Sequence, residues 1–250
     1  MDVQDGFIVG IFNYCDRWCE RCAFTSHCRV FADHAEMEAS LDTNLKAVVD
    51  APPLPEDIPP PPPPWMQELI AEAEEACRKP PTPEEWKRMK PRLPKAHKPI
   101  ARRAKQYAVR VFEWLATIEI PTPGDVRDPR EVVAWFHWMI GAKVNRALTK
   151  WPDADLEDES DNDGSAKVAL LAIDESHAAW LALVERGLVA SNDADAFIAD
   201  LVWLGEALER VRPGARAFVR PAFDEPEAVA TFLAGEGDDD GGSSVASRRR

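Results

Sequence analysis

Four cysteines near the start of the chain are the residues best suited to carry chemistry. Cys15, Cys19, Cys22 and Cys28 form a C-x3-C-x2-C-x5-C run. Thiolates gathered in one short segment typically share a metal ion or a cluster. Structural zinc modules usually bring two separated cysteine pairs, so contiguous ligands favour an iron–sulfur centre. The sequence therefore predicts one [4Fe–4S] cluster on these cysteines, with one Zn²⁺ as the alternative.

The spacing also suggests how the cysteines could meet. If the segment is helical, Cys15, Cys19 and Cys22 lie on one face, and Cys28 completes the site from the following turn. Aromatic side chains nearby would either shield a cluster from solvent or pack the segment against the rest of the protein. They are Phe12, Tyr14, Trp18 and Phe24.

Partial matches to known cluster motifs also favour iron. The first three cysteines have the C-x3-C-x2-C spacing of radical-SAM enzymes, which need a β/α barrel around the cluster. This chain has a fourth cysteine and no alternation of strands and helices, so that class is excluded. The C-x2-C-x5-C part resembles the auxiliary-cluster (SPASM) segments of some radical-SAM maturases, and this resemblance implies an iron–sulfur centre.

Two longer segments resemble a group of uncharacterised bacterial proteins. Residues 13–22 (NYCDRWCERC) resemble the opening of that group. Residues 164–170 (GSAKVAL), with the Ile173, Asp174 and Ser176 that follow, resemble a later segment of it. The resemblance implies a layout of two parts, a cysteine segment and a helical region. It implies no activity, because none is assigned to the group.

Histidines are the remaining candidates for a site. His27 precedes Cys28 and is expected beside the metal centre without binding it, since four thiolates already complete a site. His137 lies on an apolar helical stripe, and His177 follows Asp174 by one turn, so we expect hydrogen-bonded polar groups in the core. A di-iron bundle would need Glu-x-x-His twice. An enzyme pocket around His137 and His177 stays an open alternative, and no catalytic residue is assigned.

Helical periodicity runs through most of the chain and predicts an all-α protein. A C-terminal four-helix bundle should be preceded by a small cysteine-rich module. The expected parts are a four-cysteine module with a helix (1–50), a proline-rich linker (51–64), a short basic helical region (65–98), the bundle (99–234) and a disordered tail (235–250). The bundle helices are expected near 99–118, 128–150, 165–186 and 193–211. The first of them should carry one apolar stripe: Ile100, Ala104, Tyr107, Val111, Leu115 and Ile118.

Local signals refine this outline. Thr82 and Asp128 each begin a capping-box sequence with proline at the first helical position. The acidic stretch 153–164 does not match a calcium-binding loop and is expected to be a solvated connection. Several tryptophans of the bundle are expected in its core: Trp114, Trp135, Trp138, Trp180 and Trp203.

Charge and hydropathy limit the partners. The net charge of −14 opposes binding to nucleic acid, although residues 78–110 are basic. Pairing of that stretch with the acidic stretch 153–164 is the simpler expectation. No apolar run is long enough for a membrane span, and the first residues lack a basic signal region. We therefore expect a cytoplasmic metal-binding protein with an electron-transfer or redox-sensing role and a protein or redox partner. The alternative is a zinc-stapled helical interaction protein without redox or catalytic activity. Its oligomeric state stays open.

Overall fold

The computed structural model describes residues 1–50, 62–78, 82–120, 127–150 and 156–239, and it confirms the all-α class. Helices dominate the described part, and none of the helices there is long and apolar enough to cross a bilayer. The helices are α1 (Arg29–Asp50), α2 (Pro64–Arg78), α3 (Pro83–Met89), α4 (Lys98–Leu115), α5 (Pro129–Leu148), α6 (Leu156–Glu185), α7 (Ser191–Val211) and α8 (Pro226–Asp239). One small hairpin pairs β1 (Val3–Gln4) with β2 (Phe7–Ile8).

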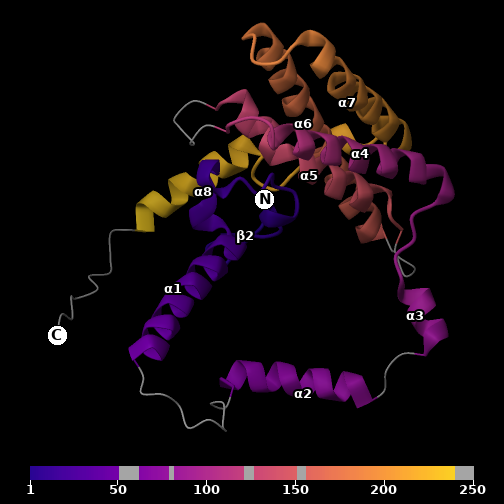
Figure 1. The fold of residues 1–250 in the computed structure, drawn as a ribbon. Coiled ribbons are helices and arrows are strands. Elements are labelled where there is room, and N and C mark those ends of the chain that lie inside the picture. The colour runs from indigo at the N-terminus through magenta and orange to yellow at the C-terminus, as the bar shows by residue number, and fades with distance from the viewer. Residues whose placement is uncertain (51–61, 79–81, 121–126, 151–155, 240–250) are drawn as a thin grey trace.

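Helices α4, α5, α6 and α7 pack together, and we call them the α4–α7 core (Figure 1). α5 contacts both α4 and α6, and α7 contacts α4 and α6 from the other side. The apolar stripe predicted for α4 is buried, including Ile100, Tyr107 and Val111. Burial of such stripes is the main term that holds helices together in water.

Trp180 lies at the centre of this core and is fully buried. Its ring stacks on Phe197 of α7 with centroids 4.4 Å apart. Its indole Nε1–H donates a hydrogen bond to the Tyr107 hydroxyl at 3.2 Å. This contact satisfies the indole donor inside the core, and burial raises the pKa of Tyr107.

One tryptophan differs from the expectation. Trp138 of α5 is 49% exposed, so it is not a core residue. Its ring lies beside Phe112 of α4, which is also exposed, with centroids 6.2 Å apart. The two rings form an apolar patch on the surface between α4 and α5.

The acidic stretch is not simply a solvated connection, because α6 begins at Leu156, well before the predicted start at Ser165. Asp161 pairs with Arg146 of α5 at 2.9 Å, and Asp163 lies 3.6 Å from Arg212. Residues 151–155 lie outside the described part. These acids therefore pair with bases of the α4–α7 core and of the loop after α7.

Two arginines of the basic stretch have a different acidic partner from the one expected. Asp200 of α7 is buried, and its carboxylate accepts hydrogen bonds from Arg103 and Arg110 of α4. The Arg103 contact measures 2.7 Å. These pairs connect α4 to α7.

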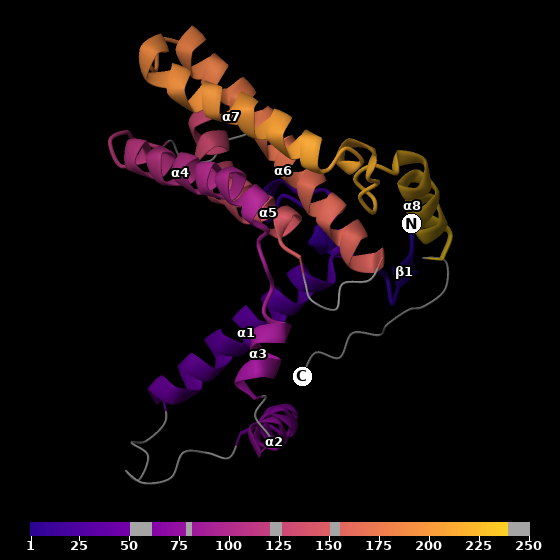
Figure 2. The ribbon, with the colours of Figure 1, turned by 90° about the vertical axis from the view of Figure 1, so that its right-hand side faces the viewer.

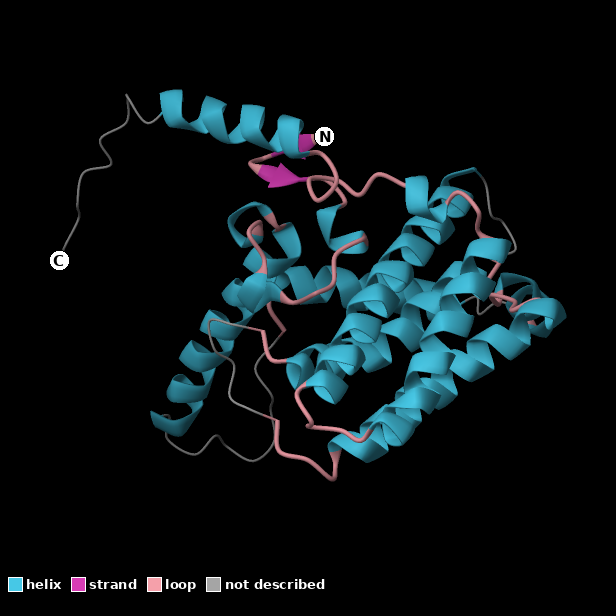
Figure 3. Ribbon diagram, turned by 90° about the horizontal axis from the view of Figure 1, so that it is seen from above, coloured by secondary structure: helices cyan, strands magenta, loops and turns pink. Residues whose placement is uncertain are grey.

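The N-terminal segment folds as the hairpin followed by three short 3₁₀ turns, η1 (Ile11–Asn13), η2 (Cys19–Arg21) and η3 (Thr25–His27). Ile8 and Ile11 are buried against Ala222, which precedes α8. The Met1 amino group pairs with Glu225 at 2.9 Å. Figures 2 and 3 show the N-terminus next to α8. The start and the end of the described chain therefore pack together, and α8 continues into the segment predicted as a tail.

Of the two predicted capping boxes, the one at Thr82 is confirmed and the one at Asp128 is confirmed only as a simple cap. Thr82 forms a complete capping box with Glu85 at the start of α3. Asp128 caps α5 through the amide of Arg130, but Glu131 does not complete a box there. The residues 51–61 of the proline-rich linker and the tail residues 240–250 lie outside the described part.

Candidate metal centre

The four cysteines come from successive turns and not from one helix. Cys15 follows η1, Cys19 begins η2, Cys22 ends η2, and Cys28 ends η3. The helical spacing considered from the sequence is therefore wrong for this segment. Short 3₁₀ turns redirect the chain every few residues. They can bring side chains of one short segment to a common point.

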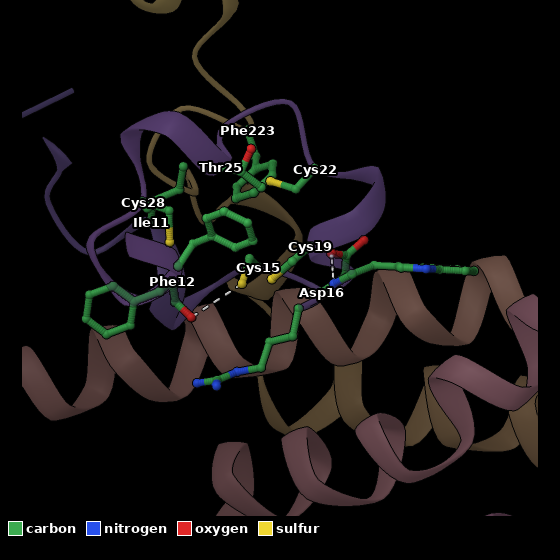
Figure 4. Close-up of a pocket in the computed structure, with 12 residues that line it drawn as sticks. Ile11, Phe12, Cys15, Asp16, Cys19, Cys22, Thr25, Cys28 and Phe223 are labelled. Atoms are coloured by element: carbon green, nitrogen blue, oxygen red, sulfur yellow. Dashed lines mark hydrogen bonds between the residues drawn. The ribbon is translucent and has the colours of Figure 1, made fainter. Parts of the chain in front are cut away.

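All four cysteines line the same small cavity, of about 20 Å³ (Figure 4). Phe12, Trp18, Phe31 and Phe223 contribute aromatic walls to it. Cys19 is exposed, and the other three thiols are half-buried. The cavity is therefore apolar around the sulfur atoms and reaches solvent on the side of Cys19.

A turn at Arg17 sets the direction of Cys19. Arg17 has φ of 55°, the left-handed region that residues with a side chain rarely adopt. The Asp16 side chain accepts a hydrogen bond from the Trp18 amide at 3.0 Å, which stabilises this turn. The chain thus reverses between Cys15 and Cys19, and both line one cavity.

Backbone amides contact two of the sulfur atoms. The Phe24 amide donates to Cys22 Sγ at 3.4 Å. The backbone amide of Arg17 makes a similar hydrogen bond to the Cys15 sulfur. Both amides lie two residues after their cysteine. Hydrogen bonds to sulfur favour the thiolate form and tune a bound metal centre.

Burial raises the pKa of the Cys15, Cys19 and Cys22 thiols. Arg17 and Lys143 are positive groups that act in the opposite direction on Cys15. The Lys143 ammonium donates to the Asn13 carbonyl oxygen at 2.8 Å, which holds it beside the segment. A metal centre with four thiolates carries net negative charge, so these cations would offset part of it.

Side chains of the α4–α7 core hold the cysteine segment in place. Trp18 stacks on Trp135 with centroids 5.0 Å apart, and Trp135 Nε1–H donates to the Asp16 carbonyl oxygen at 2.8 Å. Arg21 pairs with the buried Glu131 at 3.0 Å. The turn that carries Cys15 and Cys19 is therefore fixed against α5 by stacking, hydrogen bonding and an ion pair.

Tyr14 makes a second contact with the core. Its ring lies against Phe218, with centroids 4.8 Å apart, and over Gly164 of α6. A Cβ on Gly164 would overlap Tyr14 Cε1, so the tyrosine ring would have to move. The glycine is therefore required for the cysteine segment to approach α6.

The predicted histidines do not join this cavity. His27 contacts the Gly6 carbonyl oxygen and the Phe232 ring on the side of α8. His137 is buried beneath Phe112 and Trp138, with Nδ1 2.7 Å from the Ala134 carbonyl oxygen. The expected hydrogen bond to backbone is thus present for His137.

Asp174 and His177 do not form the expected polar core. Asp174 is exposed and pairs with Arg216, while His177 is half-buried on α6. Arg216 follows α7 in the chain, so its approach to Asp174 depends on tertiary structure. Neither His137 nor His177 lines the cysteine cavity.

Several residues that contact the cysteine segment could not be found from local sequence. Phe223 lies about two hundred positions after the cysteines, and its ring packs on Phe24 at 5.2 Å. Lys143 lies in the middle of α5. Neither has a sequence signal that links it to the cysteines. Gly164 lies at the end of the acidic stretch, directly before the predicted helix start at Ser165, and that position does not indicate a close approach of Tyr14.

Within the described part, no three Cys, His, Asp or Glu side chains lie close enough together to bind one metal ion. The thiols surround the cavity without touching a common point. Comparison of the chain with protein-family models, with curated proteins and with solved structures yields no match.

Proposed function

We propose that Cys15, Cys19, Cys22 and Cys28 hold one metal centre, with a [4Fe–4S] cluster as the first candidate and electron transfer or redox sensing as its use. The observation that carries the proposal is the common cavity that all four thiols line. Four soft thiolate donors in one apolar cavity suit a thiophilic metal and have no simple structural explanation.

The surroundings of the thiols support a cluster. Aromatic walls and amide hydrogen bonds to sulfur are the groups by which proteins adjust cluster potential and protect clusters from solvent. A bound cluster would supply a centre that gains and loses one electron. The exposed side at Cys19 would face a redox partner.

One observation favours the second candidate, a zinc ion that stabilises the N-terminal segment. A cavity of about 20 Å³ holds roughly one water-sized body, so a single ion needs less expansion than a cluster. Zinc would hold turns that have little secondary structure of their own. The protein would then be an interaction protein without redox chemistry.

We further propose that the α4–α7 core is a four-helix bundle that serves as a rigid platform. Trp135, Glu131 and Lys143 of α5 and Gly164 of α6 contact the cysteine segment. Ligands held by a rigid scaffold keep their geometry when the centre changes charge. The platform therefore supports either candidate, and metal analysis must distinguish them.

The test is the metal content and the visible spectrum of the full chain purified without oxygen. A broad band near about 400 nm with about four iron and four sulfide per chain supports the cluster. A colourless protein with about one zinc supports the structural ion. Protein that binds neither metal after reconstitution contradicts the proposal.

Cysteine variants provide the matched control. Cys15→Ser and Cys22→Ser each remove a thiol that lines the cavity and should lower bound metal at least tenfold. Cys77→Ser changes the fifth cysteine, outside the run, and should leave the metal content unchanged. Equal metal loss in Cys77→Ser would contradict the assignment of the ligands.

A further inference from the structure

An apolar groove of about 650 Å³ lies between α4 and α5 and shares no lining residue with the cysteine cavity. The two helices lie side by side in Figure 2. Leu93 and Trp138 line the groove with large apolar side chains. Small residues of both helices form its floor: Ala101, Ala108, Gly141 and Ala142. The volume lies within the range of about 300–1,000 Å³ that is usual for small-molecule sites.

Positive charges follow the α4 edge of the groove. Lys98, Arg102 and Lys105 all line it, and all three are exposed. They succeed one another at helical spacing, so they form one row of about 10 Å along α4, which we call the basic row. None of the three pairs with a carboxylate in the part of the chain that the structure describes. Because the whole chain carries a net charge of −14, this row is a local exception to the overall charge.

The α5 side of the groove is uncharged. Its lining residues there are Trp138, Gly141, Ala142 and Asn145. The Trp138 ring is exposed and lies beside the exposed ring of Phe112, with centroids 6.2 Å apart. An exposed aromatic pair next to an apolar floor is typical of a surface that an apolar group covers. The groove therefore combines an apolar floor and an aromatic side with cations along one edge.

These features select one class of ligand. A concave floor fits a single molecule, whereas binding to a membrane surface needs apolar side chains that project from the protein. Asn145 is the one side-chain amide in the lining, so the edge of a nucleotide base would find few hydrogen-bond partners. An unbranched hydrocarbon chain needs no such partners, and its burial is favourable in proportion to its area. A carboxylate at the end of the chain would meet the unpaired cations.

From these observations we propose that the α4–α5 groove binds one free fatty acid, with its hydrocarbon chain on the alanine and glycine floor and its carboxylate at the basic row. The ring of Trp138 would cover part of the chain. Binding would remove the exposed apolar floor from water and would neutralise part of the unpaired positive charge. The site is separate from the proposed metal centre and requires no metal.

Calorimetric titration of the full chain with fatty acids below their micelle concentrations tests this proposal. Dodecanoate should bind with a Kd of about 100 µM or tighter. A fully buried CH₂ group strengthens binding by about fourfold, and the open groove buries each group in part. The affinity should therefore rise at least about 16-fold from octanoate to dodecanoate. Dodecyltrimethylammonium, which joins the same chain to a cation, should bind at least about tenfold more weakly than dodecanoate.

Substitutions in the groove locate the site. Ala142→Phe fills the floor from an exposed position and should lower the affinity for dodecanoate at least about tenfold. Ala178→Phe, on an exposed position of α6, is the matched control and should leave the affinity unchanged. Arg102→Glu with Lys105→Glu reverses two charges of the basic row and should also lower the affinity at least about tenfold. Arg210→Glu, on an exposed position of α7, should change it by less than about twofold.

Four results would overturn the proposal. The first is no binding of dodecanoate to the wild type at about 1 mM, and the second is an affinity that does not depend on chain length. The third is an affinity unchanged by Ala142→Phe or by the charge reversal, which would place the ligand elsewhere. The fourth is binding to vesicles of phosphatidylcholine with phosphatidylglycerol but not to the free acid, which would assign the basic row to a membrane surface. The chain-length series uses only the wild type, so it decides the question even if a variant does not fold.

Discussion

Gly164 and Tyr14 illustrate how single residues decide whether the cysteine segment can dock. The tyrosine ring occupies the space where any larger residue of α6 would place its Cβ. Its hydroxyl also lies 3.4 Å from Asp161 Oδ1, so position 164 influences a ring and a polar contact together. The cysteine segment can therefore dock this closely because residue 164 has no side chain.

Gly164→Ala should destabilise the protein by about 1–3 kcal/mol, because the added methyl group overlaps the Tyr14 ring. Urea unfolding measures this change, and proteolysis should show earlier cleavage of the N-terminal segment. Gly205→Ala is the matched control in α7, where a Cβ meets only Ile173 at 3.8 Å. It should be neutral or stabilising. Equal effects of the two substitutions would contradict the Tyr14 argument.

His137 gives a residue-scale dependence on pH. Burial lowers its pKa below the ordinary value of 6.5, and its Nε2 has no hydrogen-bond partner in the described part. Below pH 6.5 the unfolded chain therefore binds a proton that the folded chain resists. The free energy of unfolding should fall as the pH falls from about 6.5 towards about 5.

His137→Asn should reduce this fall, since asparagine does not titrate. Unfolding by urea at about pH 7 and at about pH 5 measures the difference. His177→Asn, on a half-buried position of α6, serves as the control and should retain the slope of the wild type. The assignment to His137 would be refuted if the fall in the free energy of unfolding between about pH 7 and about pH 5 disappeared only in the His177 variant.

At the scale of elements, the α4–α7 contact combines apolar packing with one buried carboxylate. Asp200 is 7% exposed and has two arginine partners on α4. Arg110 also lies over the Phe197 ring and Arg103 over Trp203. Removal of the carboxylate would leave two guanidinium groups without their acceptor.

Asp200→Ala should lower the free energy of unfolding by about 2–4 kcal/mol, because a buried pair loses one partner. Asp195→Ala, on an exposed position of the same helix, should change it by less than about 0.5 kcal/mol. Chemical denaturation of both variants at one pH gives the comparison. A small effect at Asp200 would mean that water replaces the carboxylate without cost.

At the scale of the whole molecule, the cysteine segment lies between the α4–α7 core and the C-terminal residues. It contacts α5 through Trp135 and contacts Phe223 through Phe24. It has almost no regular secondary structure, so its order depends on these neighbours and on the proposed metal. The core has a large hydrophobic cluster to which the cysteine segment contributes only Trp18, so we expect the core to fold without the metal.

Metal removal should therefore affect the two regions differently. In Cys15→Ser with Cys22→Ser, residues 1–28 and 222–234 should lose protection against hydrogen exchange by at least about tenfold, while α5 keeps it. Far-ultraviolet circular dichroism should change little. A simultaneous loss of protection in α5 would show that the core depends on the metal.

The sequence by itself determined the all-α class, the approximate positions of α4, α5 and α7 and the presence of four clustered thiols, because these depend on local periodicity and composition. It predicted the stripe of α4 and the cap at Thr82 for the same reason. It did not predict that the cysteine segment consists of 3₁₀ turns, since the spacing of Cys15, Cys19 and Cys22 also fits a helix.

Only the tertiary structure decided which distant residues meet. Phe223, Lys143 and Gly164 reach the cysteine segment from parts of the chain that no local pattern connects to it. The acidic start of α6 likewise meets a distant partner, since Asp161 pairs with Arg146 of α5. Such contacts depend on how whole helices pack, and helix packing is set by the shapes and charges of two surfaces together.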